Sequence, residues 1–316
     1  MKICVLDGYT LALDDLSWDP LRALGEVSIY DRTSPAELHE RAQGCQAVIT
    51  NKTPLDGETI RSLPDLRYIG ILATGCNLVD LKTADELGIT VSNIPAYSTD
   101  SVAQMAIALI LAATNRVESY TQLNREGRWS ASADFCYTVA PIIELSNKTI
   151  GIFGFGHIGR KVAEIAHAFG MKVKAFTSKS ADRLPDWVEK GDEEELRVCD
   201  VVSLHCPLTD DTREMVNRQW LDKLKKGTIL VNTARGQLMD EEAVCEALRD
   251  GRLGALCTDV LPEEPPREDD PLLKAPNVFV TPHIGWASRE ARQRLLEIAV
   301  ENLSAFIDGH PQNVVK

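Results

Sequence analysis

Short apolar runs alternate with amphipathic segments along most of the chain, and this alternation restricts the possible folds more than any other feature. In the first hundred residues the apolar runs have the length of buried strands, and apolar residues recur at helical spacing between them. We expect strands at residues 3–6, 27–30, 47–50, 68–73 and 90–92, and helices at 35–42, 57–63 and 78–87. Alternation of this kind indicates βαβ units, in which helices connect the strands of a parallel sheet.

A second series of the same kind begins at Thr149. Its strands are expected at residues 150–153, 173–176, 201–204, 228–231, 255–258 and 278–281. A long helix is expected between the two series, from the capping oxygens of residues 98–100 to about Asn124, and another at residues 287–309. The sequence therefore predicts an α/β protein with two doubly wound, Rossmann-like parallel-sheet domains and a ligand cleft between them.

The charge balance excludes two classes of partner. The 316 residues include 34 Lys and Arg against 47 Asp and Glu, a formal net charge of −13. Sequence-independent binding to nucleic acid and docking on an anionic membrane both require a basic surface. The longest apolar run, Met105–Ala113, is about half the length of a membrane helix. We expect neither nucleic acid nor membrane as a partner.

Eight cysteines are scattered along the chain without a Cys-x-x-Cys pair or a neighbouring histidine cluster, so the sequence predicts no metal site. Most of them stand in apolar, strand-like contexts, as Cys4, Cys45, Cys199 and Cys257 do. This is typical of reduced core thiols in a cytoplasmic protein.

A glycine-rich motif, Gly154-Phe155-Gly156-His157-Ile158-Gly159, follows the strand that starts the second series and precedes a helix. In such a unit Gly154 allows a tight turn, Gly156 lets the backbone approach a pyrophosphate, and Gly159 lets helix and strand pack closely. A lone G-x-G-x-x-G indicates little, but inside a complete βαβ unit it predicts a dinucleotide site. We interpret His157 as a backbone-position residue and not as a catalyst.

The end of the next strand bears on which dinucleotide is bound. NAD-binding units carry an acid there for the ribose hydroxyls, whereas this chain has Thr177, Ser178 and Lys179. Two hydroxyls and an ammonium suit a 2′-phosphate, so NAD(P) with a preference for NADP is expected. The alternative is that Lys179 is a solvated loop residue and that either cofactor is accepted.

Three chemically distinct side chains follow successive strands of the second series. Arg235 can bind a carboxylate through two parallel hydrogen bonds, and His283 can transfer a proton. Asp259 and the acidic residues after it supply carboxylates. Each alone has a structural explanation: a surface arginine, a helix-capping aspartate, a core histidine. Together they are the groups that hydride transfer to a 2-keto acid requires.

On these residues the chain resembles the D-isomer-specific 2-hydroxyacid dehydrogenase family, and within it the glycerate dehydrogenase/hydroxypyruvate reductase branch. The resemblance covers nearly the whole chain and rests on the segments Ala73–Asp80, Tyr97–Gln104, Gly154–Gly159, Asn232–Gly236, Asp259–Pro265 and Thr281–Gly285. It implies Arg235, Glu264 and His283 as the catalytic residues. Glu264 is preferred over Glu263 because it lies five residues after Asp259 and directly precedes Pro265. An ionised Glu264 would orient the His283 ring and favour its charged form.

The remaining site residues fall into two groups. Substrate binding is assigned to a glycine-containing turn whose N–H groups can cradle a carboxylate, together with the catalytic arginine and histidine: Thr74, Gly75, Cys76, Arg235 and His283. Cofactor binding is assigned to residues at the strand ends: Gly154, Gly156, His157, Ile158, Gly159, Thr177, Ser178, Lys179, Cys206, Pro207, Thr233, Ala234, Asp259 and Gly285. For His205 and Cys206 we expect packing first and cofactor contact second.

The resemblance also implies how the chain is organised. The outer, substrate domain would comprise residues 1–98 and 288–316, and the dinucleotide-binding domain residues 99–287. The long helix after Asp100 would lie at the interface of a homodimer. The aromatic segment Trp129–Tyr137 would either reach the partner subunit's active site or pack in the core.

Other functions remain open on the same fold, because fold alone does not decide function. One is a dinucleotide-sensing transcriptional co-regulator. Others are dehydrogenases for D-lactate or phosphoglycerate, and formate or phosphite dehydrogenases. The formate enzymes pair their histidine with a glutamine, so Glu264 argues against that activity. Hydroxypyruvate, glyoxylate and pyruvate cannot be ranked as substrates from the sequence.

Overall fold

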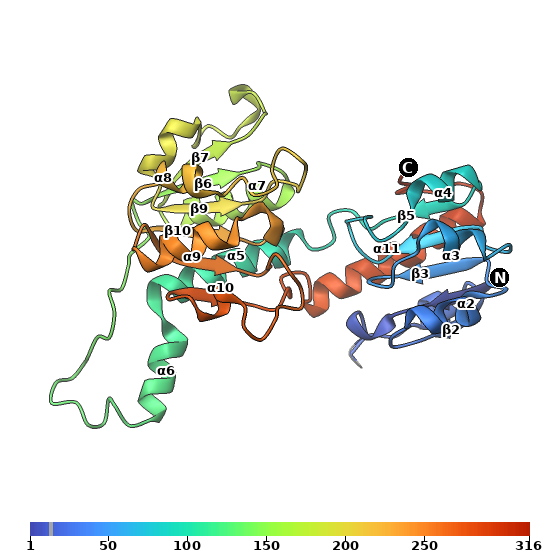
Figure 1. Ribbon diagram of the computed structural model, residues 1–316, viewed down its shortest axis with the longest axis horizontal. Coiled ribbons are helices and arrows are strands. Elements are labelled where there is room, and N and C mark those ends of the chain that lie inside the picture. The colour runs from blue at the N-terminus through green and yellow to red at the C-terminus, as the bar shows by residue number, and fades with distance from the viewer. Residues whose placement is uncertain (13–14) are drawn as a thin grey trace. The chain divides into compact units, whose positions relative to one another are not determined.

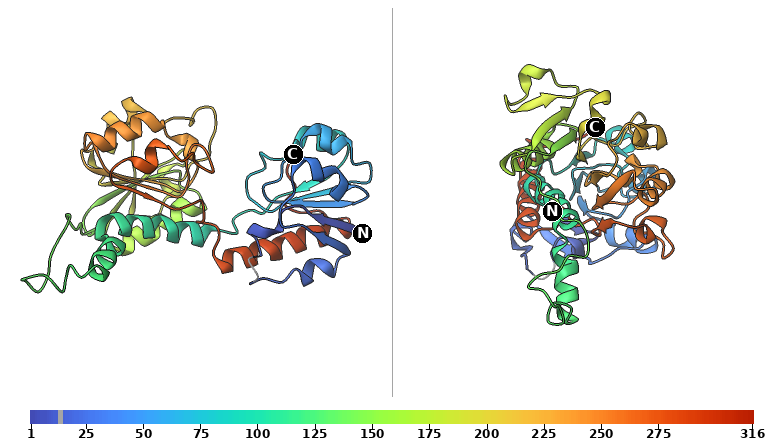
Figure 2. Two further views of the ribbon diagram at one scale, coloured as in Figure 1. Left: turned by 60° about the horizontal axis from the view of Figure 1, so that its bottom comes forward. Right: turned by 90° about the vertical axis from the view of Figure 1, so that its left-hand side faces the viewer.

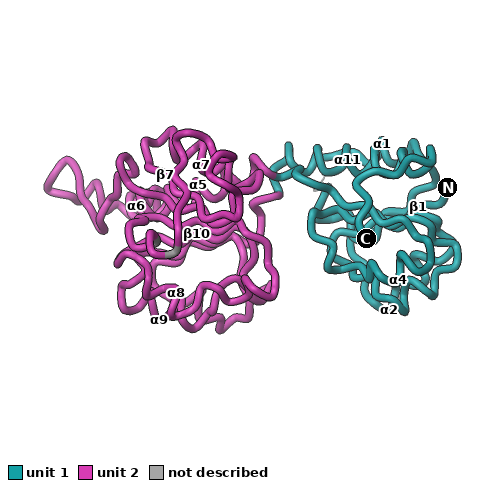
Figure 3. Tube along the Cα trace, turned by 90° about the horizontal axis from the view of Figure 1, so that it is seen from above, with its two compact units in different colours: residues 1–98, 287–316 teal, residues 99–286 magenta. Residues whose placement is uncertain are grey.

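The structure is a computed structural model that describes residues 1–12 and 15–316, and its chain divides into two compact units (Figure 3). Unit 1 comprises Met1–Ser98 and Ala287–Lys316, and unit 2 comprises Thr99–Trp286. Each unit is built on one parallel sheet, so the prediction of two parallel-sheet α/β domains is confirmed. Among the described residues, no helix has the length and apolar character needed to span a bilayer.

The sheet of unit 1 has the strand order β2-β1-β3-β4-β5, with every neighbouring pair parallel. This is a doubly wound order, and its direction reverses between β1 and β3. The strands are β1 (Lys2–Val5), β2 (Glu26–Ile29), β3 (Ala47–Thr50), β4 (Tyr68–Ile71) and β5 (Thr90–Ser92).

Helices cover both faces of the unit 1 sheet. Three of them supply residues to one apolar cluster with the strands, namely α2 (Pro35–Ala42), α3 (Gly57–Arg61) and α4 (Leu81–Glu86). Helix α2 begins where a capping box would place it, because Ser34 and Glu37 satisfy each other's backbone N–H groups and Pro35 has no N–H that would need an acceptor. The helix α11 (Arg289–Ile307) packs on β4 and on α1 (Asp19–Arg22), and Phe306 contacts the Tyr68 ring. A short 3₁₀ turn, η1 (Gly8–Thr10), follows β1.

The sheet of unit 2 has the strand order β12-β11-β10-β9-β6-β7-β8, again parallel throughout (Figure 1). Its direction reverses between β6 and β9, as in a dinucleotide-binding fold. The strands are β6 (Thr149–Phe153), β7 (Lys172–Phe176), β8 (Val188–Lys190), β9 (Val201–Leu204), β10 (Thr228–Asn232), β11 (Leu253–Thr258) and β12 (Val278–Val280). The short strand β8 was not expected from the sequence.

Two apolar clusters cover the faces of this sheet. On one face lie α5 (Thr99–Asn115) and α7 (His157–Ala168), and on the other lie α8 (Arg218–Asp222) and α9 (Glu241–Arg249). The remaining elements are α6 (Val117–Arg125), α10 (Pro271–Lys274), η2 (Ala181–Arg183), η3 (Glu193–Val198) and η4 (Gly236–Leu238). Four cysteines expected in the core, at positions 4, 45, 199 and 257, are buried free thiols.

The expectation of one continuous helix to about Asn124 is wrong. The helix breaks at Arg116, which has the left-handed φ of 52° and separates α5 from α6. The Arg116 guanidinium reaches Asn277 Oδ1 at 3.1 Å and lies over the Phe279 ring, and these contacts hold the turn. Helix α6 then leaves the body of unit 2, together with the segment after it (Figures 1 and 2).

Candidate active site

Most of the predicted site residues lie at one edge of the unit 2 sheet. Because all seven strands are parallel, their carboxyl ends share that edge. The glycine motif follows β6, and Arg235, Asp259 and His283 follow β10, β11 and β12, which are adjacent strands. Folding therefore gathers groups that are more than a hundred residues apart in the sequence.

The glycine motif has the geometry of a phosphate-binding turn. Gly154 has φ of +87°, and a Cβ there would lie 2.6 Å from the His205 carbonyl oxygen. A Cβ at Gly159 would lie 2.1 Å from the Gly154 carbonyl oxygen, so helix and strand can pack only around a glycine. A Cβ at Gly156 would meet no atom within 4 Å, and this residue caps α7, whose first residues are His157 and Ile158. Open space in front of a helix N-terminus suits an anionic phosphate.

The segment after β7 lies against this turn. Lys179 Nζ donates to the Phe155 carbonyl oxygen at 2.7 Å, and the Lys179 N–H donates to Thr177 Oγ1 at 3.3 Å. The ammonium is thus fixed on the glycine turn although the side chain is exposed, and Ser178 beside it is exposed as well. After β7 this chain therefore has the hydroxyls of Thr177 and Ser178 and the Lys179 ammonium. NAD-specific units have a carboxylate at this position.

The turn after β10 is organised by Asn232, a residue to which the sequence pattern assigned no role of its own. The fully buried Asn232 accepts a bond from the Ala234 N–H and donates to the Arg235 carbonyl oxygen. Asparagine is a frequent turn-former of this kind, so its position directly after a strand was a usable signal. Thr233 between them is 8% exposed, and its Oγ1 is buried without a hydrogen-bond partner.

An unsatisfied buried hydroxyl at this edge is consistent with a bound ligand that supplies its partner. With the open space at Gly156, it shows that the residues present fit a dinucleotide. Cys206 and Pro207 follow β9 at the same edge, where Cys206 Sγ contacts Met215 Sδ at 3.8 Å. Burial raises the pKa of the Cys206 thiol, so this group is neutral near pH 7.

Arg235 stands exposed at the same edge, and its Nη1 donates to the Ala234 carbonyl oxygen at 2.7 Å. The next residue must be glycine, because a Cβ at Gly236 would lie 2.0 Å from the Leu261 carbonyl group. This close approach brings the turn after β10 against the segment that carries Glu264. The guanidinium keeps donors available for a substrate carboxylate.

His283 and Glu264 form a direct pair. His283 Nδ1 lies 2.6 Å from Glu264 Oε2, and the two side chains are 33% and 34% exposed. The other carboxylate oxygen, Oε1, accepts the Leu261 N–H at 2.9 Å, which fixes the orientation of the carboxylate. With Nδ1 engaged in this way, Nε2 is the ring nitrogen available for proton transfer.

The loop that carries His283 is anchored by Asp259, which is 3% exposed. Asp259 Oδ1 accepts from Thr281 Oγ1 at 2.5 Å and from the Ile284 N–H, and Oδ2 accepts from the Gly285 N–H. The carboxylate that was expected to face the cofactor therefore also fixes the loop that carries His283. From the far side, Trp286 Nε1 donates to the His283 carbonyl oxygen, a contact that nothing in the sequence pattern indicated.

His205 packs inside the loop that follows β9. Its Nε2 lies 2.8 Å from Ser203 Oγ, and burial lowers the pKa of the ring to about 4. The imidazole is thus neutral near pH 7, and its role is packing. Within the described part of the chain, no three His, Cys, Asp or Glu side chains are grouped so as to hold a metal ion.

Unit 1 carries the predicted substrate turn, directly after β4. Thr74 Oγ1 donates to the Ile94 carbonyl oxygen at 2.8 Å, and Asn93 Nδ2 donates to the Thr74 carbonyl oxygen. These two hydrogen bonds fix the backbone at the start of the turn. In the described residues, the N–H groups of Gly75, Cys76 and Asn77 make no hydrogen bond within the chain, so three successive donors are free for an anion.

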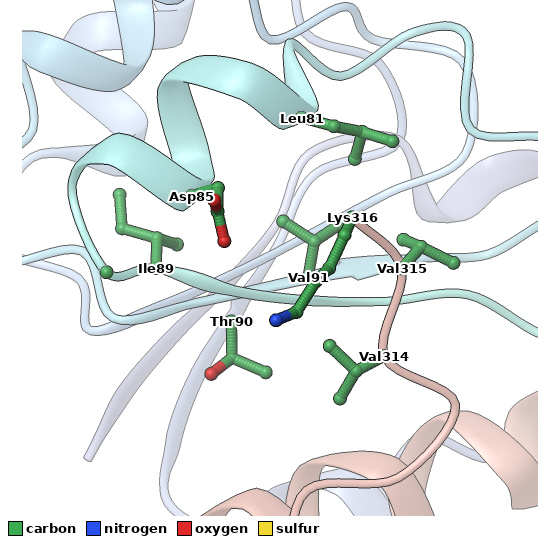
Figure 4. Close-up of a pocket in the computed structure, with 9 residues that line it drawn as sticks. Leu81, Asp85, Ile89, Thr90, Val91, Val314, Val315 and Lys316 are labelled. Carbon is green, nitrogen blue, oxygen red and sulfur yellow. The ribbon is translucent and has the colours of Figure 1, made fainter.

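A cavity of about 170 Å³ lies elsewhere in unit 1, between α4, β5 and the C-terminal segment (Figure 4). Its wall is largely aliphatic, with Asp85 and Lys316 as its charged groups. The C-terminal segment bridges to β5 through Ser92 and Val314, which makes the cavity a groove at the sheet edge. It contains none of the predicted site residues.

Comparison with known proteins agrees with this geometry. Residues 107–285 match the family described as D-isomer specific 2-hydroxyacid dehydrogenase, NAD binding domain. The hydroxypyruvate reductase of Blautia hydrogenotrophica is 45% identical over 100% of this chain and 99% of its own. The glycerate dehydrogenase of Methylorubrum extorquens is 42% identical over 92% of each chain.

A solved structure, the TT0316 protein of Thermus thermophilus, superposes with a TM-score of 0.88 at 37% identity over the full length of both chains. The match thus extends through both units. The chain belongs to the D-isomer-specific 2-hydroxyacid dehydrogenase family, in its glycerate dehydrogenase/hydroxypyruvate reductase branch.

Proposed function

We propose that the protein reduces hydroxypyruvate or glyoxylate to the corresponding 2-hydroxy acid, and oxidises D-glycerate in the reverse direction. The observation that carries this proposal is the His283–Glu264 pair, 2.6 Å between Nδ1 and Oε2, at the same sheet edge as Arg235 and the glycine turn. The names of the relatives point to the same small keto acids. D-Lactate and phosphoglycerate are alternative substrates of the same site.

In this proposal each side chain has one task. Arg235 binds the substrate carboxylate and polarises the carbonyl group. His283 donates the proton from Nε2 to the carbonyl oxygen, which becomes the hydroxyl of the product. Glu264 balances the charge of the imidazolium and fixes its ring, and Asp259 holds the loop. A bound nicotinamide dinucleotide supplies the hydride for the carbonyl carbon.

The residues that would hold this dinucleotide are the glycine turn, the Thr177–Lys179 segment and Thr233. We propose NADPH as the preferred form, because Lys179 Nζ is fixed on the glycine turn and no carboxylate follows β7 before Asp182. A charged donor placed there favours a 2′-phosphate.

We further propose a homodimer formed through an arm, residues 117–144. No residue of α6 is buried, and the exposed fractions are 67% for Val117, 55% for Trp129, 90% for Phe135 and 56% for Ile142. The alternative that Trp129–Tyr137 packs in the core is wrong, since Phe135 is almost fully exposed. Apolar side chains grouped on a projecting segment are typical of an interface, and a second copy of this chain is the proposed partner.

The test is turnover of NADH and NADPH with hydroxypyruvate, glyoxylate and pyruvate, each followed by the absorbance of the reduced cofactor. The proposal expects saturable oxidation of the cofactor with at least the first two acids. With hydroxypyruvate it also expects glycerate of the D configuration by chiral analysis. A protein that binds the cofactor but turns over none of the three acids would instead support the co-regulator alternative. Reduction of pyruvate alone would replace the proposed substrate by pyruvate.

A further inference from the structure

The carbonyl group of His283 is held by an indole. Trp286 Nε1 donates to the His283 carbonyl oxygen at 2.9 Å, and among the described residues no other donor bonds to this oxygen. Trp286 is half-buried and follows His283 by three residues. A backbone N–H at that spacing ordinarily closes a turn, and here the side chain takes its place.

The backbone that this bond restrains has an infrequent conformation. His283 has φ of +53°, in the left-handed region that residues other than glycine seldom adopt. Its N–H donates to the carbonyl oxygens of Asp259 and Thr281 at 2.8 and 2.9 Å. The indole of Trp286 holds the carbonyl side of the same residue. With both of its peptide groups restrained, the direction in which the His283 side chain leaves the backbone is fixed.

The place of Trp286 in the chain makes this restraint important for His283. Trp286 is the last residue of unit 2, and Ala287 already belongs to unit 1. Gly285 is tied to the start of α5, because Ser101 Oγ donates to the Gly285 carbonyl oxygen at 2.5 Å. Two side chains of unit 2 therefore hold the backbone between His283 and the crossing to unit 1.

We propose that Trp286 is a positioning residue for proton transfer, whose indole N–H keeps the His283 backbone in the conformation that directs Nε2 at the substrate carbonyl. The inference rests on the proposed function, in which His283 donates the proton. Glu264 Oε2, 2.6 Å from Nδ1, orients the ring, and Trp286 orients the backbone that carries the ring. A small misplacement of the donor is costly, because proton transfer requires hydrogen-bond distance to the acceptor.

The experiment compares Trp286→Phe with Trp286→His. Phenylalanine keeps an apolar ring but has no N–H, whereas histidine loses ring volume and can donate from Nε2, which stands where the indole nitrogen stands in its ring. In Trp286→Phe, kcat for the keto acid that the parent reduces best should fall about tenfold, with KM for the cofactor unchanged. Trp286→His should retain more of the parent kcat than Trp286→Phe. An indole that served packing alone would give the opposite order.

The solvent isotope effect on kcat separates positioning from a loss of folded protein. A misplaced donor slows proton transfer, so the ratio of kcat in water to kcat in deuterium oxide should be higher in Trp286→Phe than in the parent. A smaller folded fraction would lower kcat and leave this ratio unchanged. The matched control is Trp187→Phe. Trp187 is a half-buried tryptophan that stacks on the His167 ring before β8, the edge strand opposite β12, so the variant should keep the parent values.

The proposal is overturned by an unchanged kcat or an unchanged isotope effect in Trp286→Phe, or by a lower kcat in Trp286→His than in Trp286→Phe. A higher KM for the keto acid at the parent kcat also overturns it, since the indole would then contact the substrate instead of positioning the proton donor. A parent that reduces no keto acid overturns the proposed function itself, and that measurement is made before any variant is compared.

Discussion

At the scale of single residues, the backbone of His283 is the most unusual feature of the site. Its φ is +53°, a left-handed conformation that non-glycine residues adopt infrequently. The His283 N–H donates to the Asp259 carbonyl oxygen at 2.8 Å, and the Asp259 side chain holds the residues on both sides. The fold thus imposes the conformation from several directions, as is common where a catalytic side chain must be aimed.

Replacing His283 by alanine should lower turnover in the reductive direction by about 10²- to 10⁴-fold, because the proton donor is lost. Cofactor affinity, measured by fluorescence titration with NADPH, should stay near that of the parent. His310→Ala, at an exposed site in the C-terminal segment, is the control and should be fully active. Near-parent turnover in His283→Ala would remove this residue from the mechanism.

Glu264→Gln should preserve the shape of the contact with Nδ1 but remove the anion that faces the imidazolium. The protonated ring then loses its charge partner, so kcat for keto acid reduction should fall, while KM for the cofactor should stay near that of the parent. The measurement is the steady-state kinetics of both proteins at one neutral pH. Equal kcat values would mean that the charge of Glu264 does not contribute to proton transfer.

His205 should make the fold sensitive to acid. Its pKa is about 4 in the folded protein, against about 6.5 in an unfolded chain. The unfolded state therefore takes up a proton first, and stability is lost as the pH falls from about 6.5 toward 4. Lowering the pH from about 7 to about 5 should lower the thermal midpoint of the parent more than that of His205→Gln, which cannot titrate. The contribution is at most about 2 kcal/mol over this range, and equal decreases would contradict the prediction.

At the scale of elements, the strands and their order along the chain could be predicted from the sequence. The break in the long helix at Arg116 and the short strand β8 could not. Periodicity located all the strands except β8 to within a few residues, since buried parallel strands read as continuous apolar runs. The break at Arg116 escaped because neither proline nor glycine marks it, and the contacts that hold it come from residues 277 and 279. Such a break is decided by tertiary structure.

The same distinction applies to the site. Arg235, Glu264 and His283 could be proposed because each follows a strand and has a recognisable chemistry. Asn232 and Trp286 act by bonding to backbone groups, and a pattern of residue types does not show which backbone groups they meet. Asp259 was assigned to the cofactor, while its contacts with Thr281, Ile284 and Gly285 appear only in three dimensions.

The segment Thr177–Lys179 after β7 predicts which form of the cofactor is preferred. Thr177→Asp should place an acceptor for ribose hydroxyls at the end of the strand and repel a 2′-phosphate. We expect the parent to have the higher kcat/KM with NADPH and the variant to have it with NADH. Ser180→Asp, three residues further along, is the control and should leave the order unchanged. A parent that strongly prefers NADH would show that the Lys179 ammonium serves only the Phe155 carbonyl group.

At the scale of the whole molecule, the two units carry different chemical groups at the carboxyl ends of their strands. The carboxyl edge of unit 2 carries His283, Arg235 and the glycine turn, whereas that of unit 1 carries the N–H groups of Gly75–Asn77. Hydride transfer needs both the dinucleotide and the keto acid, so neither unit is expected to be active alone. The chain crosses between the units at Ser98–Thr99 and at Trp286–Ala287. On the unit 1 side, Arg294 Nε donates to the Tyr97 carbonyl oxygen and Arg292 Nε to that of Ala287, so both crossings start from fixed backbone.

The last prediction concerns assembly through the arm. Its segments are held to one another, with Trp129 Nε1 bonded to the Phe135 carbonyl oxygen and Tyr137 bonded to Asn124, so the arm is ordered without burying its apolar side chains. That surface should be covered by a second copy in solution. The parent should therefore have the mass of a dimer by light scattering, about twice 34.8 kDa.

Phe135→Ser together with Ile142→Ser should shift this equilibrium toward the monomer at low micromolar concentration, because the variant removes apolar area from the interface and touches no core residue. Val198→Ser, at an exposed apolar site of unit 2 outside the arm, is the matched control and should remain dimeric. Activity measured across the same dilution series adds a second readout: if the arm completes the partner's site, turnover per chain falls as the dimer dissociates. A parent that is monomeric throughout would refute the homodimer and leave the arm to a different partner.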